Sequence, residues 1–282
     1  MSTIRKVGIV IKPHAPRIES VLSDLGAYLD RRGVPYLLEE AAAEKLGRPG
    51  GLPRAKVPEE SDLVVVLGGD GTLLSIAHIA ARHGVPVMGV NLGSLGFLTE
   101  VTLPEMTLAL DALLDGAPGV ISSRLLLEAT FKGEASLCLN DVVINKGAVA
   151  RMIHLKIWID DRGLETLKAD GLIIATPTGS TAYSLAAGGP ILYPSIPAVL
   201  LTPICAHTLS FRPIVISSDT RIRIELLTSG EEVYLTFDGQ RGGAMVNGDV
   251  VEVRRAKHAL NLVSSPQRNY FGLLSEKFSW GG

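Results

Sequence analysis

The sequence is poor in cysteine, with only Cys138 and Cys205 in 282 residues. Two cysteines are too few for a disulfide scaffold, and their separation is not that of a zinc site. Both lie among apolar neighbours, so we expect two small buried residues in a reducing compartment, and therefore a cytoplasmic protein. The apolar run that follows Arg5 and Lys6 is too short for a signal peptide.

Excess charge is also lacking, since the formal net charge is −2. The net charge of the whole chain therefore does not indicate a nucleic acid or a membrane as partner. Residues 171–211 contain no Asp, Glu, Lys or Arg, but five prolines and Gly188-Gly189 interrupt any helix long enough to cross a bilayer. We predict instead that this uncharged segment is deeply buried, and that it contributes to a self-association surface.

The residues that are present suit two folded domains, since 46% of the chain is hydrophobic. Residues 1–120 alternate apolar strands with helical stretches, which predicts an α/β domain with a parallel sheet. Residues 121–255 alternate with period two, which predicts an antiparallel, sandwich-like all-β domain. The aromatic-rich tail, 256–282, is expected to pack back onto the α/β domain.

Within the first domain, the pattern predicts particular elements and one plain loop. Residues 41–60 are rich in proline and glycine and indicate a surface loop without chemistry of its own. The predicted strands are 6–11, 34–38, 63–67 and 85–90, and the predicted helices are 18–31 and 73–83.

The most informative stretch is Val-Val-Val-Leu-Gly-Gly-Asp-Gly-Thr at 64–72. Its glycines allow positive φ and close approach of a ligand, and Thr72 is expected to cap the next helix. A strand–glycine loop–helix unit suits phosphate oxygens, although the Gly-Lys-Ser/Thr of a P-loop is absent. Because a carboxylate repels phosphate, Asp70 indicates a general base or an outer ligand of magnesium. The alternative is that Asp70 only tightens a turn or caps the helix.

A second glycine-bearing loop, 91–98, is predicted at the same sheet edge and includes Phe97. An ordinary connection with an exposed aromatic is the alternative. In the second domain, Asn140-Asp141 interrupts an apolar run, and such a pair suits a sugar diol or an adenine edge. A turn at the end of a strand would explain it as well.

Residues 168–184 form a third cluster. Lys168 suits a phosphate and Asp170 a ribose hydroxyl or an adenine amine, unless the two form a solvated ion pair. The strand that follows leads into a hydroxyl-rich turn, 176–184, whose side chains suit a polyol or a phosphate ligand.

These motifs together resemble those of the NAD kinase family, in order and in spacing, over nearly the whole chain. The elements that carry the resemblance are Gly68-Gly69-Asp70-Gly71-Thr72, Asn140-Asp141, Asp170-Gly171, Thr176-Pro177-Thr178-Gly179-Ser180-Thr181-Ala182-Tyr183-Ser184 and Asp238-Gly239-Gln240. The first element also occurs in diacylglycerol and sphingosine kinases and in phosphofructokinases, whereas the fourth is specific to this family.

The resemblance implies an enzyme that phosphorylates the 2′-hydroxyl of the adenosine ribose of NAD to give NADP. It implies ATP as donor with a divalent metal, expected to be magnesium, and Asp70 as proton acceptor. No dedicated metal site is expected if the ion is held by the ATP phosphates. A homodimer or homotetramer with sites near subunit contacts is also implied.

The same resemblance implies that the β-rich domain, 121–255, binds NAD, and it places a set of residues at the substrates. Two of them depart from the family pattern: Asp141 stands where Glu is most common, and Lys168 where Arg is common, which loses a bidentate donor. The implied substrate- and nucleotide-binding residues are Gly68, Gly69, Gly71, Thr72, Phe97, Asn140, Asp141, Arg151, Lys168, Asp170, Thr181, Ala182, Tyr183, Ser184, Leu185, Ala186 and Gln240.

Two other functions stay open from the residues alone. A lipid or sugar kinase of the same superfamily would share the Asp70 loop but has no need of the 176–184 stretch. A non-catalytic sensor that binds NADP(H) would keep the dinucleotide site and dispense with the base.

Overall fold

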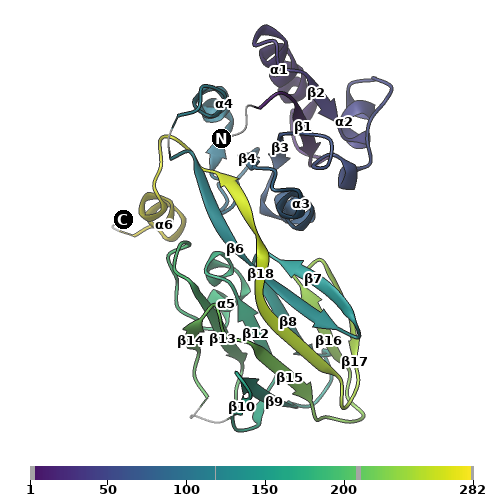
Figure 1. Ribbon diagram of the computed structural model, residues 1–282, viewed down its shortest axis with the longest axis vertical. Coiled ribbons are helices and arrows are strands. Elements are labelled where there is room, and N and C mark those ends of the chain that lie inside the picture. Colours follow the sequence, from purple (N-terminus) through teal and green to yellow (C-terminus); the bar gives the residue numbers. More distant parts are fainter. Residues whose placement is uncertain (1–3, 118, 208–210, 281–282) are drawn as a thin grey trace. The chain divides into compact units, whose positions relative to one another are not determined.

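The computed structural model describes residues 4–117, 119–207 and 211–280 of the chain. It divides into two compact units: Met1–Ser123 with Ala259–Gly282 (unit 1), and Arg124–His258 (unit 2) (Figure 1). The chain passes from one unit to the other within two long strands, β6 (Ile121–Phe131) and β18 (Val250–Val263).

Unit 1 is an α/β unit built on a parallel sheet, so this part of the predicted fold class is confirmed. The strand order is β2-β1-β3-β4, and β4 also pairs in parallel with β5 and with the last residues of β18. The residues of β1, β3 and β4 are all buried, as in a sheet that is covered on both faces. The strands are β1 (Val7–Ile11), β2 (Tyr36–Leu38), β3 (Leu63–Gly68), β4 (Val87–Asn91) and β5 (Val101–Thr102).

The helices of unit 1 lie between strands in the chain, apart from α6, which follows the last strand, β18. They are α1 (Ile18–Arg31), α2 (Glu40–Lys45), α3 (Asp70–His83), α4 (Met106–Leu114) and α6 (Tyr270–Phe278), with the 3₁₀ turns η1 (Arg54–Lys56) and η2 (Leu103–Glu105). Strands β2 and β4 begin two residues later than predicted, directly after Pro35 and Pro86. Proline has no N–H to donate to the ladder, which accounts for both late starts.

The prediction of a plain surface loop over 41–60 was wrong. This segment contains α2 and η1, and Arg54 of η1 reaches back to the sheet. Its Nε lies 2.7 Å from Oε2 of Glu39, a side chain that is only 2% exposed, and its guanidinium also donates to the carbonyl of Ile11 at the end of β1. A guanidinium with several acceptors satisfies a buried carboxylate, so the segment anchors the end of β1.

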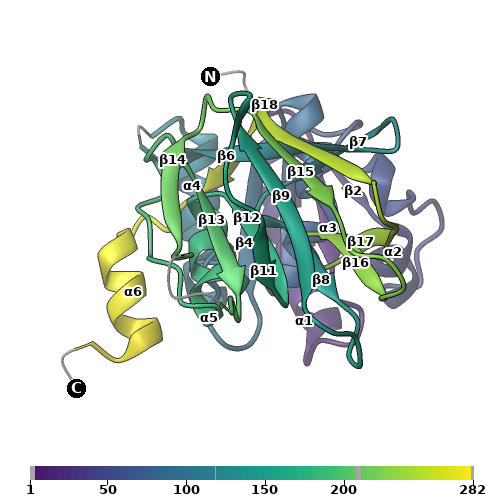
Figure 2. The same ribbon diagram turned by 90° about the horizontal axis from the view of Figure 1, so that it is seen from below.

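Unit 2 consists of antiparallel strands in two sheets, which confirms the second part of the predicted fold class. One sheet has the order β14-β13-β12-β8-β16-β17. The other places β9, β15 and β18 side by side, as Figure 2 shows. The strands of the first sheet are β8 (Asp141–Lys146), β12 (Gly171–Ala175), β13 (Ala198–Ile204), β14 (Ile214–Ser217), β16 (Val233–Phe237) and β17 (Arg241–Met245).

The two sheets of unit 2 share one apolar core. Alternate residues of β9, β15 and β16 are buried in it, as the period of two in the sequence predicts. The remaining strands are β7 (Glu134–Cys138), which pairs with β6, and β9 (Ile153–Ile159), which pairs with β10 (Arg162–Gly163) and β11 (Leu167–Ala169). The 3₁₀ turn η3 (Thr178–Thr181) and the short helix α5 (Tyr183–Ala186) follow β12.

The uncharged segment 171–211 is buried only in part. Strands β12 and β13 are buried, but the connection between them leaves Tyr193 44% and Ile196 42% exposed. Residues 208–210 lie outside the described residues, and the self-association surface stays a prediction. Cys138 is buried as expected, whereas Cys205 is exposed, at the end of β13 and with φ 46°, so that expectation was wrong. In the described part of the chain, no helix is long and apolar enough to cross a membrane.

Candidate active site

The carboxylate of Asp70 is bound by the loop that follows β4. Its Oδ1 accepts hydrogen bonds from the N–H of Leu98 (3.1 Å), the N–H of Thr99 (2.9 Å) and the hydroxyl of Thr99 (2.8 Å). Its Oδ2 accepts one from the N–H of Phe97 (2.9 Å). The structure therefore brings together the two glycine-bearing loops that the sequence predicts at one sheet edge.

This arrangement distinguishes the two oxygens of Asp70. Each carboxylate oxygen has about two acceptor positions, so Oδ2, with one donor among the described residues, keeps a position for a further proton donor. Oδ1 is fully engaged. The loop needs a glycine beside it, because a β-carbon at Gly96 would overlap Oδ1 of Asp70.

The glycines before and after Asp70 have roles that differ from those predicted. Helix α3 begins at Asp70 with Gly69 as N-cap (φ −113°), so Thr72 lies inside the helix and does not cap it. None of Gly68, Gly69 and Gly71 is in the left-handed region. A β-carbon at Gly68 would lie 2.7 Å from Oγ1 of Thr72, so this glycine is needed for close packing of the helix on the strand.

A cavity of about 180 Å³ opens next to the glycine loop within unit 1. Lys12 and His14, which follow β1, line it together with Gly68 and Gly69, which follow β3. The connection Asn91–Ser94, which follows β4, completes the wall. Backbone N–H groups with an ammonium group beside them suit an anion. Lys12 and His14 are not among the residues predicted from the sequence; their position directly after a parallel strand is the signal that could have identified them.

The ring of Phe97 contacts the C-terminal helix. Its centroid lies 5.9 Å from that of Phe278, and Nζ of Lys277 lies 5.6 Å from it on the ring face. Phe97 is thus neither an isolated exposed aromatic nor wholly buried.

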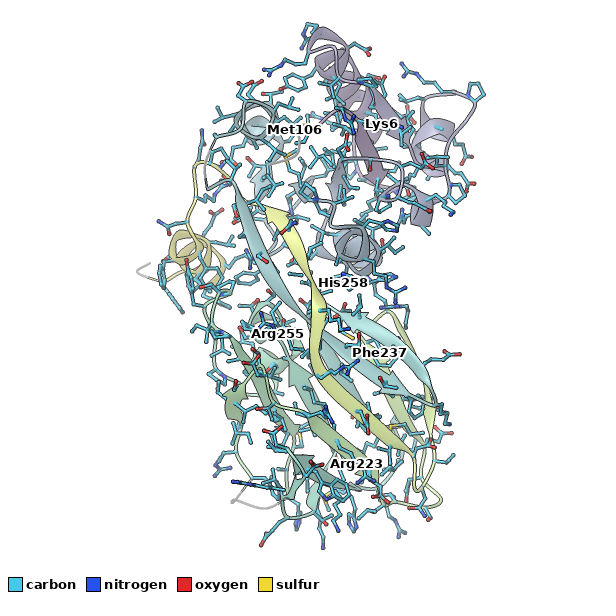
Figure 3. All side chains as sticks on the ribbon, viewed as in Figure 1. Lys6, Met106, Arg223, Phe237, Arg255 and His258 are labelled. Atoms are coloured by element: carbon cyan, nitrogen blue, oxygen red, sulfur yellow. The ribbon has the colours of Figure 1, made fainter. Side chains whose placement is uncertain are left out.

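In unit 2, the Asn140-Asp141 turn is held by a second carboxylate. Asp238 lies just beyond Phe237, which is labelled in Figure 3, and has φ 51°. Its carboxylate accepts from the N–H of Leu139 (2.9 Å), Asn140 (2.7 Å) and Asp141 (3.1 Å). The predicted site omits Asp238, although it belongs to the Asp238-Gly239-Gln240 motif. Gln240 itself is exposed.

Burial raises the pKa of both carboxyl groups of this turn, and the charge of Asp238 adds to the shift at Asp141. Asp141 is 5% exposed, and its burial, together with the charge of Asp238, raises its pKa to about 7. Burial also raises the pKa of Asp238, against three backbone N–H groups and Arg241, which lower it. A carboxyl group that is protonated near neutral pH can donate as well as accept a hydrogen bond.

Several hydroxyls of the turn after β12 form hydrogen bonds within unit 2. Thr176 Oγ1 donates to the carbonyl of Leu139 and accepts from the N–H of Gly179, and Ser180 Oγ donates to the carbonyl of Pro177. Ser184 Oγ lies 2.8 Å from the hydroxyl of Thr202.

The same turn packs directly on the Asn140 turn. A β-carbon at Gly179 would overlap the carbonyl oxygen of Asn140. Thr178 Oγ1 is buried and has no hydrogen-bond partner among the described residues. In the next stretch, 181–186, Thr181, Ala182 and Leu185 are half-buried, whereas Tyr183 and Ala186 are exposed.

The other predicted residues of unit 2 lie at the opposite end of the strand pair β8–β12. The register pairs Asp141 with Ala175 at one end and Asn145 with Gly171 at the other. Four residues separate these pairs along each strand, roughly 13 Å. Asp170 and its neighbours therefore lie well away from the Asn140 turn.

At that far end, Asp170 pairs with a cation that the sequence reasoning missed. Nζ of Lys146 lies 3.4 Å from Oδ1 of Asp170 and donates to the carbonyl of Ala150 at 2.8 Å. Asp170 thus forms an ion pair, but with Lys146 rather than Lys168. Lys168 is exposed between the buried Leu167 and Ala169. Arg151 is exposed as well, and its backbone N–H donates to Glu231.

No metal centre is apparent in the parts of the chain that the structure describes. Within them, no three His, Cys, Asp or Glu side chains are grouped so that they could hold an ion.

Comparisons with known proteins agree with the family resemblance that the sequence motifs indicate. The family model of the ATP-NAD kinase N-terminal domain matches residues 7–117, and that of the C-terminal domain matches 139–265. The chain is 47% identical over 282 residues to the NAD kinase of Geotalea daltonii, and equally to that of Geobacter sulfurreducens, with 99% of both chains covered in each case.

Solved structures share the fold. The yeast NADH kinase complexed with NADH aligns with a TM-score of 0.89 at 28% identity, covering 100% of this chain and 89% of that one. The NAD kinase of Archaeoglobus fulgidus in complex with ATP aligns with a TM-score of 0.80 at 22% identity, covering 98% and 100%, and shows the fold alone.

These relatives confirm the prediction of an NAD kinase, a phosphotransferase, and favour neither the lipid or sugar kinase nor the non-catalytic sensor. Both family models together span most of the sequence, and the relatives span nearly all of it. The chain belongs to the NAD kinase family.

Proposed function

We propose that the protein transfers the γ-phosphoryl group of ATP to the 2′-hydroxyl of the adenosine ribose of NAD, with Asp70 as proton acceptor. The O–P bond to the ribose forms, the bond between the β- and γ-phosphates breaks, ADP leaves, and the hydroxyl proton passes to Oδ2 of Asp70. The observation that carries this role is the fixed carboxylate, whose Oδ1 is held by three donors while Oδ2 keeps an acceptor position.

The donor is proposed to bind at the cavity of unit 1. Gly68, Gly69 and Lys12 line this cavity, Gly71 and Thr72 lie in the first turn of α3, and Lys12 adds positive charge. Phosphoryl transfer depends on alignment and on neutralisation of charge more than on covalent chemistry by the protein. The matching family models describe ATP-NAD kinases, which supports ATP as the donor.

Magnesium enters this proposal only as part of the substrate. Among the described residues, no group of side chains near the glycine loop could hold a metal ion. Oδ1 of Asp70 already accepts hydrogen bonds from Leu98 and Thr99. An ion carried by the ATP phosphates would need no such cage.

Residues of unit 2 are proposed to bind the dinucleotide, and Phe97 is proposed to pack near a nicotinamide ring. Asn140 and Asp141 would hold a ribose, and Thr181, Ala182, Tyr183, Ser184, Leu185 and Ala186 would line the site, with Gln240 closing it. Arg151, Lys168 and Asp170 are the other residues proposed to contact substrate or its new phosphate.

A homodimer or homotetramer would explain why these residues form two groups. Asn140 and Asp170 stand at opposite ends of the β8–β12 pair, roughly 13 Å apart along the strands. We propose that the two groups meet on one ligand by coming from two copies of the chain, near a subunit contact. The exposed Tyr193 and Ile196 of the uncharged segment support such a contact. A cytoplasmic location stays a prediction.

The test is NADP formation from purified protein with NAD, ATP and magnesium, read by a dehydrogenase that accepts only NADP. The wild type should give signal and Asp70→Asn should not. Silence of the wild type, with NAD binding intact by calorimetry, would overturn the proposed reaction.

A further inference from the structure

The C-terminal segment 268–280 contacts the loop 95–100 at three points within unit 1. Arg268 donates from its guanidinium to the carbonyl of Glu100 at 3.2 Å, and Lys277 donates from Nζ to the carbonyl of Leu95 at 2.6 Å. Between these two points, the ring of Phe278 lies 5.9 Å from that of Phe97. The segment thus holds both ends and the middle of the loop.

The same loop binds Asp70 on its other side. The backbone N–H groups of Phe97, Leu98 and Thr99 all donate to the Asp70 carboxylate. Residues 95–100 belong to no helix or strand, so side-chain contacts such as these hold them in place. The loop therefore connects Asp70 physically to the C-terminal segment.

The C-terminal segment is itself well anchored. The guanidinium of Arg268 lies 2.7 Å from Oε2 of Glu105, a carboxylate that is only 9% exposed, and the side chain of Asn269 caps α6 by accepting from the N–H of Gly272. Leu273 and Leu274 of α6 are buried. A half-buried, hydrogen-bonded ion pair and a capped helix make a firm support for the loop.

We propose that the C-terminal segment positions Asp70 through the loop 95–100, with Lys277 and Phe278 as positioning residues. The catalytic part of this proposal rests on the proposed role of Asp70 as proton acceptor, whereas the mechanical part does not. Oδ1 takes its orientation from the N–H groups of Leu98 and Thr99, so a displaced loop turns Oδ2 away from the ribose hydroxyl. A proton acceptor works only within hydrogen-bond reach, and a misplacement of about 1 Å lowers the rate strongly.

The experiment compares the double variant Lys277→Met/Phe278→Ala with the wild type, Lys277→Met alone and Lys277→Arg. Lys56→Met is the matched control, because Lys56 is an exposed lysine of unit 1 that pairs with Glu59. Hydrogen–deuterium exchange of the peptide that covers Phe97–Thr99 reports the loop directly. Steady-state kinetics then report kcat and KM for NAD and ATP.

The double variant is expected to exchange the loop amides faster and to lose kcat on the order of tenfold, with both KM values little changed. Lys277→Met should show a smaller effect of the same kind, and Lys277→Arg should restore it, since arginine also donates to the Leu95 carbonyl. Lys56→Met should match the wild type. A merely structural role would lower the melting temperature without this split between kcat and KM.

Unchanged exchange in the double variant would overturn the proposal. Faster exchange with wild-type kcat would also overturn it, because the loop would then move without consequence for Asp70. If the double variant does not fold, Lys277→Met carries the same test. A wild type that forms no NADP would instead overturn the proposed function and the role of Asp70 with it, while exchange would still decide whether the segment holds the loop.

Discussion

Asp141 and Asp238 form a reciprocal pair, in which each backbone N–H donates to the other residue. The N–H of Asp238 donates to the carbonyl of Asp141 at 3.0 Å, and the N–H of Asp141 donates to the carboxylate of Asp238 at 3.1 Å. This geometry brings two acidic side chains together in a turn where Asp141 is 5% exposed. Arg241 is the cation whose charge acts on Asp238 there.

Stability is expected to fall as the pH rises through the range in which Asp141 ionises. Burial and the Asp238 charge raise its pKa from 3.8 to about 7. The unfolded chain therefore releases this proton near pH 4, whereas the folded chain keeps it until about pH 7. The stabilisation is complete below about pH 4 and is lost progressively up to about pH 7, by up to roughly 4 kcal/mol.

Asp141→Asn should remove this dependence and melt above the wild type at pH 8, while the two should be similar at pH 5. Thermal melts between pH 4 and 8 measure the difference, with the exposed Asp24→Asn as control. An equal fall in stability with pH in Asp141→Asn and wild type would contradict the assignment to Asp141.

Asp70→Asn is expected to lower kcat by about 10²–10⁴ while NAD still binds. Part of this loss comes from the base and part from the loop, because an amide cannot accept hydrogen bonds on both of its heavy atoms. Thr99→Val separates the two contributions: it removes one donor to Oδ1 and leaves the carboxylate, so its kcat should fall less. Kinetics and calorimetry with NAD check both variants, and full activity of Asp70→Asn would exclude Asp70 as the base.

Gly96→Ala is expected to lower kcat by about 10² with the fold retained. The added β-carbon would overlap Oδ1 of Asp70 and lie against the hydroxyl of Thr99, so the loop must move away from the carboxylate. Gly243→Ala is the matched control, since a β-carbon there meets no atom within 4 Å. Circular dichroism and kinetics test the pair, and wild-type kcat in Gly96→Ala would show that the loop tolerates the shift.

The fold class could be predicted from the sequence because burial leaves periodic traces. Every residue of β3 is apolar or glycine and buried, whereas in β15 buried and more exposed residues alternate, so the two kinds of strand differ in their sequence patterns. The specific motif at 176–184 indicated the family, which the comparisons confirm. The bond between Asp70 and Phe97–Thr99 could not be predicted, because backbone N–H donors are the same for every residue type.

The partner of Asp170 in the structure could not be identified from the spacing of residues in the sequence. Lys168 is two residues from Asp170 in the chain, the spacing at which residues of one strand share a face, but β11 ends at Ala169, before Asp170. Lys168 stands between the buried Leu167 and Ala169 and is exposed, while Lys146 reaches Asp170 from the neighbouring strand. The register of β8 with β12 brings Lys146 and Asp170 together, and this register cannot be predicted from the residue spacing within either segment.

Lys12→Met should raise the KM for ATP by roughly tenfold and leave NAD binding unchanged. Lys12 lines the cavity beside Gly68 and Gly69, where its ammonium group would meet the negative charge of the donor phosphates. A hydrogen bond to a charged group contributes about 1.5–3 kcal/mol. Methionine keeps the apolar part of the lysine side chain but removes the ammonium group and its hydrogen bond. Kinetics at saturating NAD and calorimetry without ATP separate the two substrates, with Lys56→Met as control. A rise in the dissociation constant of NAD at an unchanged KM for ATP would move the donor phosphates away from this cavity.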